Sequence, residues 1–208
     1  MNTWERQSWL DAATLESMEE LNAEVVALLK TQCQAGGVQL PLIQDVSDLL
    51  LNLDAASMRR AAGSAVLLVD AGFADGSRWS DVIVGGVNDR PYAAPEPFFT
   101  VDAAVGVMRL VMTQAWHLAR SEPAAARLLL GLSATNLTVI GGCTLNRLIV
   151  LAESRAQWLR PRWENRPRIW RDLLRTAAEG DAGALERLRV RGLHLLAADA
   201  RASGAAGG

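Results

Sequence analysis

A stretch of ten residues occurs twice in this chain, and this repetition limits the possible folds more than any other feature of the sequence. Residues 49–58 align with residues 128–137 without a gap, and five of the ten positions are identical. The same offset of 79 residues places Trp79 on Trp158. Internal repetition of this kind indicates two copies of one small module in a single chain.

The repeat divides the 208 residues into two modules and their connections. Modules of about 75 residues are marginally stable alone, which favours packing of the two copies against each other as an intramolecular pseudo-dimer. From the repeat and the positions of Gly and Pro, we predict a first module at residues 14–84, a Gly/Pro linker at 85–100, a second module at 101–175, a C-terminal helix at 176–202 and a disordered tail at 203–208.

The spacing of apolar residues predicts an all-α fold in both copies. In the first copy, a long helix is expected to begin at Ser17, which has capping-box spacing to Glu20, or one turn earlier at Thr14. Its counterpart in the second copy is expected to begin with Asp102 as N-cap. The apolar stripes of these two helices either pack against each other or cover the core of their own module.

The repeated block predicts a pair of short helices in each copy. Asp54 and Ser133 occupy the same repeat position as N-caps, and Gly63 and Gly142 are expected to end those helices in the left-handed conformation. Thr144 is expected to cap the following helix. We expect that helix to bury Leu145, Leu148, Ile149 and Ala152, and a first-copy equivalent to use Val66, Leu67 and Val69. Such a helix pair matches a DNA-reading unit or an ordinary helical hairpin.

The formal net charge of -2 hides an uneven distribution along the chain. Residues 1–97 carry 6 basic and 14 acidic side chains, whereas residues 98–208 carry 15 basic and 9 acidic ones. The two copies therefore differ in the partners that they can face.

The composition argues against several classes of protein. Cys33 and Cys143 are the only cysteines and lack the spacing of a zinc site, so we expect no metal and a reducing, cytoplasmic location. No apolar run approaches the roughly 20 residues that span a bilayer, and the N-terminal residues lack the pattern of a signal peptide. We expect no membrane association.

The best candidate for a functional site is the segment from Trp158 to Arg171, where arginines and tryptophans alternate. The predicted DNA- or partner-binding residues are Arg160, Arg162, Arg166, Arg168 and Arg171, with Trp158, Trp163 and Trp170 as interface residues. These side chains could bind nucleic-acid phosphates or form a protein interface. Alternatively, the tryptophans are core anchors and the arginines a solvated rim.

No pattern in the sequence indicates catalysis or a cofactor. His117 and His194 are far apart, and the Gly141-Gly142 pair lacks the lysine of a phosphate-binding loop. We therefore expect no enzymatic activity and no bound cofactor.

Several short motifs of the second copy occur at spacings typical of a known family. They are Leu130-Gly131-Leu132, Ile140-Gly141, Thr144-Leu145, Leu151-Ala152-Glu153 and Arg162-Trp163. Through them the second copy resembles the flagellar transcriptional activator FlhD family, and the first copy resembles the same family more faintly. The resemblance implies a helical protein whose subunits dimerise through long interlocked helices. It also implies assembly with the zinc-bearing partner FlhC on promoter DNA.

Two departures from the family pattern are visible. The family has a single module that self-associates, whereas here two copies are fused, and tethering supplies a high effective concentration. The family also has a cysteine that links subunits, where this chain has Leu159.

From the residues and the resemblance together, we expect a transcriptional co-regulator that assembles with an FlhC-like subunit on promoter DNA and activates transcription. Homo-oligomerisation is a further possibility. The alternative is an assembly or chaperone-like scaffold of a secretion or flagellar system that does not bind DNA, because a fold does not dictate a function.

Overall fold

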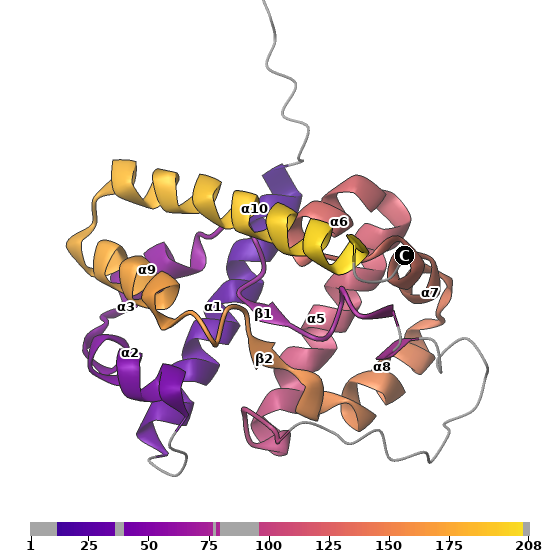
Figure 1. Ribbon diagram of the computed structural model, residues 1–208. Coiled ribbons are helices and arrows are strands. Elements are labelled where there is room, and N and C mark those ends of the chain that lie inside the picture. Colours follow the sequence, from indigo (N-terminus) through magenta and orange to yellow (C-terminus); the bar gives the residue numbers. More distant parts are fainter. Residues whose placement is uncertain (1–11, 36–39, 77, 80–95, 206–208) are drawn as a thin grey trace, which may run out of the picture.

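The computed structural model describes residues 12–35, 40–76, 78–79 and 96–205, except for the side chains of residues 202–205. Within this part of the chain there are nine α-helices, one 3-10 helix and two short strands (Figure 1). The predicted helical character is confirmed. The elements are α1 (Ala12–Gln34), α2 (Pro41–Asn52), α3 (Ala55–Ala62), β1 (Val69–Asp70), α5 (Val101–Ser121), α6 (Pro123–Leu130), α7 (Ala134–Gly142), α8 (Leu145–Ser154), η1 (Ala156–Trp158), β2 (Arg160–Pro161), α9 (Pro167–Glu179) and α10 (Ala182–Ala205).

The long helices α1 and α5 lie at the centre and contact each other (Figure 1). Helices α2 and α3 pack on α1, while α6, α7 and α8 pack on α5. Helix α9 covers α2 and α3, and α10 contacts α6 and α9. One cluster of buried apolar side chains includes Met18 of α1, Met108 of α5 and Leu185 of α10. Both predicted modules therefore contribute side chains to the same buried cluster.

The two long helices do not begin as predicted. Helix α1 starts at Ala12, so Ser17 lies inside the helix rather than at its N-cap. Thr14 is also inside α1, and its hydroxyl donates a hydrogen bond of 2.9 Å to Glu122. Thr100 is the N-cap of α5. Asp102 instead occupies the first turn, where its charge is favourable for the helix dipole.

The repeated cap position is confirmed in both copies. The Asp54 side chain accepts a hydrogen bond of 2.7 Å from the Ser57 amide. The Ser133 hydroxyl accepts one of 3.1 Å from the Asn136 amide. Thr144 caps α8 in the same way, as predicted. These positions follow from local sequence because a cap bonds only to its own helix.

The glycines that end the repeated helices are not left-handed. Gly63 is the C-cap of α3 with a φ of -66°, and Gly142 is the last residue of α7. Left-handed glycines occur instead at Gly131 after α6 and at Gly180 after α9.

The copies diverge after these helices. In the first copy Val66, Leu67 and Val69 do not form the predicted helix but lie in an extended segment that leads into β1. This strand pairs antiparallel with β2, with Val69 opposite Pro161 and Asp70 opposite Arg160.

A buried asparagine of α1 holds the extended segment in place. The Asn22 amide nitrogen donates hydrogen bonds to the carbonyls of Ala62, Ser64 and Val66 at 3.2, 3.1 and 3.0 Å. Its side-chain oxygen accepts a bond of 2.9 Å from the Leu68 amide. Because Asn22 is fully buried, these bonds satisfy backbone groups that have no helix or sheet partner.

In the second copy the equivalent stretch forms α8, which packs mainly on α5. Leu148, Leu151 and Ala152 are buried there. Leu145 and Ile149, predicted to be buried, are exposed, because α8 has a helix neighbour on one side only.

Some predicted boundaries differ from the structure or lie outside the described residues. Residues 203–205 belong to α10 rather than to a disordered tail, and residues 206–208 are outside the described part. The same applies to residues 80–84 of the first module and 85–95 of the linker. Of the helices described, none alone has the length and apolar composition to cross a membrane, although the pair α6 and α7, bent by 117°, passes that test together.

Candidate functional site

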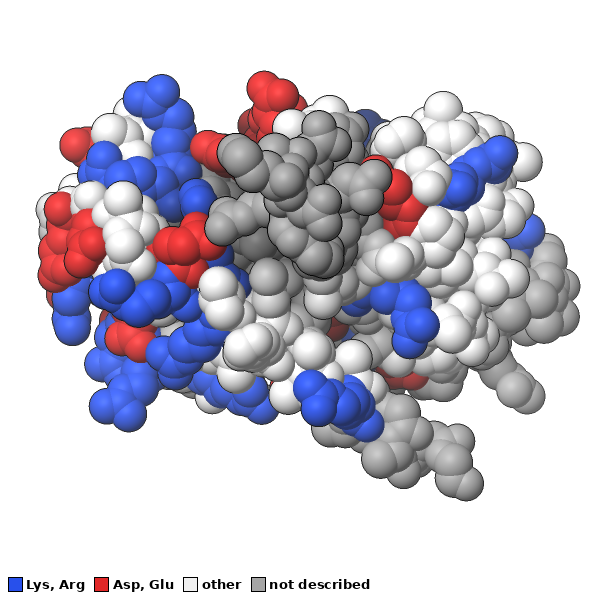
Figure 2. Space-filling model, turned by 90° about the horizontal axis from the view of Figure 1, so that it is seen from above, with Lys and Arg blue, Asp and Glu red and all other residues white. Residues whose placement is uncertain are grey.

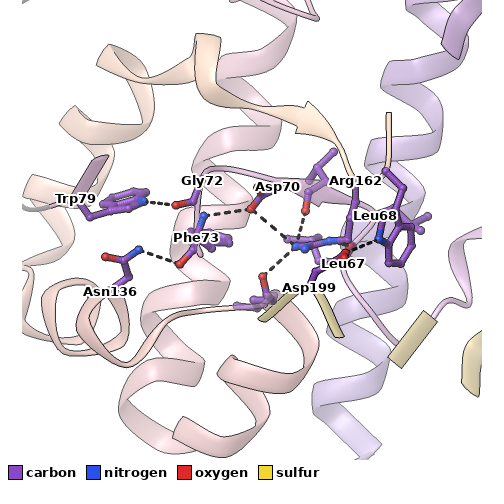
Figure 3. A network of polar contacts seen from close by, with 12 residues as sticks. Leu67, Leu68, Asp70, Gly72, Phe73, Trp79, Asn136, Arg162 and Asp199 are labelled. Carbon is purple, nitrogen blue, oxygen red and sulfur yellow. Dashed lines mark hydrogen bonds and ion pairs between the residues drawn. The ribbon is translucent and has the colours of Figure 1, made fainter. Parts of the chain in front are cut away.

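Arg162 lies between the two copies and forms the centre of a buried polar network (Figure 3). Its Nε donates a hydrogen bond of 2.8 Å to the carbonyl of Leu67. Its Nη2 donates to the carbonyls of Val69 and Leu130 at 3.1 and 2.9 Å. Only 8% of the residue is exposed. Contrary to the prediction, the Arg162 side chain is therefore buried and does not contribute to a binding surface.

The charge of Arg162 is only partly compensated by carboxylates. Burial lowers the pKa of its guanidinium, and the negative charges of Asp70 and Asp199 act in the opposite direction. The Asp70 carboxylate lies 4.0 Å away. Because the ordinary pKa of arginine is far above neutrality, the group remains protonated and three carbonyl oxygens help to stabilise it.

The three tryptophans of the segment are buried as well. The Trp158 ring packs edge-on against Trp79, with the ring centroids 5.8 Å apart. The Trp170 indole donates a hydrogen bond of 2.7 Å to the Arg162 carbonyl. Trp163 has a φ of 57° and packs under α10. All three lie where core anchors are expected, rather than on an exposed face.

Two of the predicted arginines, Arg160 in β2 and Arg166 at the N-cap of α9, have acidic partners. Arg160 is half-buried, pairs with Glu164 at 2.7 Å and donates to the carbonyl of Glu96 at 2.8 Å. Arg166 is exposed and pairs with Asp199 at 3.5 Å. These pairs reduce the charge that either side chain can offer to another molecule.

The other two predicted arginines lie on α9. Arg171 pairs with Asp45 of α2 at 3.8 Å, whereas Arg168 is exposed. The structure thus separates the five predicted arginines. Arg162 is buried, Arg160 is in β2, Arg166 is the N-cap of α9, and Arg168 and Arg171 lie on α9.

A larger group of arginines gathers where α3, α9 and the first half of α10 meet. Figure 2 shows basic side chains concentrated at this end of the molecule, with acidic residues between them. We call this surface the basic end and define it by Arg59, Arg60, Arg168, Arg171, Arg175, Arg187, Arg189 and Arg191.

The arginines of the basic end differ in how far they are engaged. Within the described part of the chain, the side chains of Arg59, Arg168, Arg175 and Arg187 have no ion pair or hydrogen bond. Arg60 donates a hydrogen bond of 2.6 Å to a carbonyl of α9. The four unengaged guanidinium groups are exposed and keep their bidentate donor geometry for another molecule.

Most residues of the basic end were not predicted from the sequence as binding residues. Arg59 and Arg60 belong to the first copy, and Arg187, Arg189 and Arg191 belong to α10. The alternating arginines of α10 were visible in the sequence. Their proximity to α3 was not, because it depends on how α10 folds back over the first copy.

The described residues contain no group of three or more His, Cys, Asp or Glu side chains that could hold a metal ion. Burial raises the pKa of the Cys33 and Cys143 thiols, which disfavours the reactive thiolate. His117 and His194 are exposed on different helices, α5 and α10.

Comparison of the chain with protein-family models, curated proteins and solved structures found no significant match.

Proposed function

We propose that this chain is an FlhD-like assembly subunit of a transcription activator, with the two copies paired as an intramolecular pseudo-dimer. The basic end contacts promoter DNA when the chain is joined to an FlhC-like partner subunit. The observation that carries the DNA contact is the set of exposed, unengaged arginines at the basic end.

Local symmetry around the strand pair supports the pseudo-dimer. Two residues after each strand, the backbone has a positive φ, at Gly72 in the first copy and at Trp163 in the second. A tryptophan then bonds back to the chain in each copy. Trp79 donates to the Gly72 carbonyl at 3.1 Å, and Trp170 donates to the Arg162 carbonyl at 2.7 Å.

Packing between the copies is also reciprocal. Helix α9 of the second copy packs on α2 and α3 of the first. In return, the Phe73 carbonyl of the first copy accepts hydrogen bonds from the Asn136 side chain and the Ser133 amide at α7. Each copy therefore places the segment after its strand on the repeated helices of the other, as expected for interlocked subunits.

These contacts change which tryptophans of the two copies correspond to each other. The constant offset aligns Trp79 with Trp158, but in the pseudo-dimer that we propose Trp79 corresponds to Trp170, because each of these two indoles donates to a carbonyl within two residues of its copy's strand. The offset does not persist because residues 66–70, which follow α3, form no helix, whereas α8 follows α7.

The chemistry of the basic end suits phosphate groups. Arg168 and Arg175 are seven residues apart on α9, which places them on one stripe about 10 Å apart along the helix. Guanidinium groups form bidentate hydrogen bonds with phosphate oxygens. Contacts to phosphates position a protein on DNA without reading its sequence, which fits a supporting subunit that leaves sequence recognition to its partner.

The test is immunoprecipitation of the full chain from cross-linked cells of its native host, with identification of the bound protein and DNA. We expect an FlhC-like protein and a restricted set of promoters. The triple variant Arg168→Ala/Arg175→Ala/Arg187→Ala should reduce promoter enrichment at least tenfold and retain the partner protein. The matched control is Arg109→Ala/Arg127→Ala/Arg201→Ala, which removes three exposed arginines elsewhere and should leave enrichment unchanged. Equal enrichment for both triple variants would contradict the DNA contact.

A protein-interaction scaffold without DNA binding is the second candidate function. It is favoured by the exposed apolar residues Leu145, Ile149 and Val150 on α8, and by the ion pairs of Arg160 and Arg166. For this function, the same experiment should recover components of a secretion or flagellar apparatus and no promoter DNA.

A further inference from the structure

Helix α10 packs on the rest of the molecule less closely than the other long helices do. It crosses the molecule from α9 to α6 (Figure 1). Of its residues 182–201, whose side chains are described, three are buried, namely Leu185, Gly192 and Leu196. Nine residues are buried in α1 and eight in α5. Because tertiary packing supplies most of the stability of a helix in a protein, α10 is stabilised less than α1 or α5.

Two hollows border α10. A groove of ≈ 610 Å³ separates the middle of α10 from the first turns of α1. A cavity of ≈ 30 Å³ lies between α10, α9 and the turn after α3. Protein interiors are otherwise close-packed, with few voids larger than a water molecule. The two hollows therefore mark places where α10 does not fit closely against its neighbours.

The two halves of α10 are packed into different clusters. Leu185, in the first half, belongs to the main core cluster. Leu196, in the second half, belongs to a small separate cluster with Val66 and Trp163. Gly192 lies between the two halves, in the interior of the helix, where glycine lowers helix stability. A Cβ atom at this position would lie 3.4 Å from Val66 Cγ2, an ordinary contact, so the packing does not require glycine.

Polar contacts of the second half converge on Asp199. Its carboxylate accepts a hydrogen bond of 3.0 Å from the Trp163 indole and pairs with Arg166 at 3.5 Å. Both partners belong to the segment between β2 and α9. Loss of this one carboxylate therefore removes two polar contacts of the second half at once.

We propose that residues 193–205 of α10, which we call the strap, open as one unit at Gly192 while the core stays folded. Opening uncovers Val66 of the first copy and Trp163 of the second, beside the guanidinium of Arg166. Tryptophan and arginine often carry the binding energy of protein interfaces. The strap therefore controls the access of other molecules to this surface. The first half of α10 stays attached through Leu185, so the basic end remains assembled.

The experiment is native-state hydrogen exchange of the full chain, measured by NMR at low concentrations of urea. The amides of residues 195–201 should exchange through one common opening, at least about a hundredfold faster than the buried amides of α5. Low urea should not change the rates in the strap, because its opening exposes little surface. Rates that instead rise steadily towards residue 201 would show fraying of a helix end and would overturn the proposal.

Gly192→Ala tests the position of the hinge. Alanine favours a helix interior more than glycine does, and the structure has room for its methyl group. Exchange in the strap should become about fivefold slower. An unchanged rate would mean that α10 does not open at Gly192.

Asp199→Ala tests the polar contacts of the strap. Its matched control is His194→Ala, which alters an exposed residue of the same segment. Aspartate and histidine have similar helix propensities, so the difference between the variants reports the contacts of Asp199. Exchange in the strap should be about tenfold faster for Asp199→Ala than for the control, because the hydrogen bond involves a charged group. Equal rates would contradict the proposal.

Leu118→Ala distinguishes opening of the strap from unfolding of the whole protein. Leu118 is fully buried in α5, and its truncation should accelerate exchange of the buried α5 amides at least tenfold. The strap should keep its rate, because its opening does not break the core. Circular dichroism checks that this variant is folded. Equal acceleration in α5 and the strap would show that α10 opens only when the protein unfolds. None of these measurements involves DNA or an FlhC-like partner, so their outcome is separate from that of the proposed function.

Discussion

The two copies start their short helices in the same way and then use the next residues for opposite purposes. Asp54 and Ser133 cap α3 and α7 at the same repeat position. After α3, the chain runs extended through the interior, where Asn22 holds its backbone. After α7, it forms α8, which leaves apolar side chains exposed. A repeated local signal therefore fixes where a helix begins, while contacts with the rest of the molecule decide the conformation of the chain beyond that helix.

Arg162 is the strongest test of how the copies depend on each other. Its side chain belongs to the second copy and bonds to Leu67 and Val69 of the first. Arg162→Ala leaves these buried carbonyls without donors, and we expect the free energy of unfolding to fall by about 3–5 kcal/mol. Urea unfolding followed by circular dichroism measures this change.

The matched control is Arg168→Ala, which removes an exposed arginine of the same segment and should change the free energy of unfolding by less than about 0.5 kcal/mol. Similar effects of the two substitutions would show that the Arg162 side chain does not stabilise the contact between the two copies.

Asn22 tests the first copy alone. Asn22→Ala removes the donor for three carbonyls and the acceptor for the Leu68 amide. We expect a loss of about 2–4 kcal/mol in the free energy of unfolding, because these buried backbone groups lose their partners. Hydrogen exchange should also increase at Leu68. Asn146→Ala on the exposed side of α8 is the control, and it should have little effect.

The comparison between the copies also explains which features could be predicted from sequence. The caps at Asp54, Ser133 and Thr144 depend on residues within one helical turn. These predictions were confirmed. The left-handed conformations expected at Gly63 and Gly142 were wrong, because a helix can also end without one.

The candidate site was harder to predict because it depends on contacts between distant segments. The position of Arg162 is set by pairing of β1 with β2, two strands that lie in different copies. No local pattern distinguishes Arg162 from Arg168, although one is buried and the other exposed.

The motifs that carry the family resemblance have structural roles in this chain. Gly131 is a left-handed C-cap, Thr144 is an N-cap, Ala152 is buried and Arg162 bonds to backbone carbonyls. The resemblance therefore bears on the fold more directly than on DNA binding, which must be tested at other residues.

A smaller effect is expected at the repeated cap of the second copy. Ser133→Ala removes the side-chain acceptor for the Asn136 amide. The expected loss is about 1 kcal/mol in the free energy of unfolding, measured in urea at neutral pH. Ser133→Asp keeps a cap and should restore most of this stability. No difference between Ala and Asp at this position would contradict a capping role.

The smallest effect distinguishes the two caps by pH. The hydrogen bond from the Ser57 amide lowers the pKa of the Asp54 carboxyl. A carboxyl with a lowered pKa in the folded state contributes stability that is present above its unfolded pKa of about 4. That stability is lost as the pH falls through the lower folded value. The loss of stability in Asp54→Ala relative to the unaltered chain should therefore shrink between pH 6 and pH 3. The loss in Ser133→Ala should stay constant, because a hydroxyl does not titrate in this range.

Urea unfolding of both variants across this pH range measures the two losses of stability, and Asp54→Asn, a cap without a charge, should behave like serine. A deficit at Asp54 that is independent of pH would mean that the two caps act through the same uncharged hydrogen bond, and the copies would then differ only in the segments beyond their short helices.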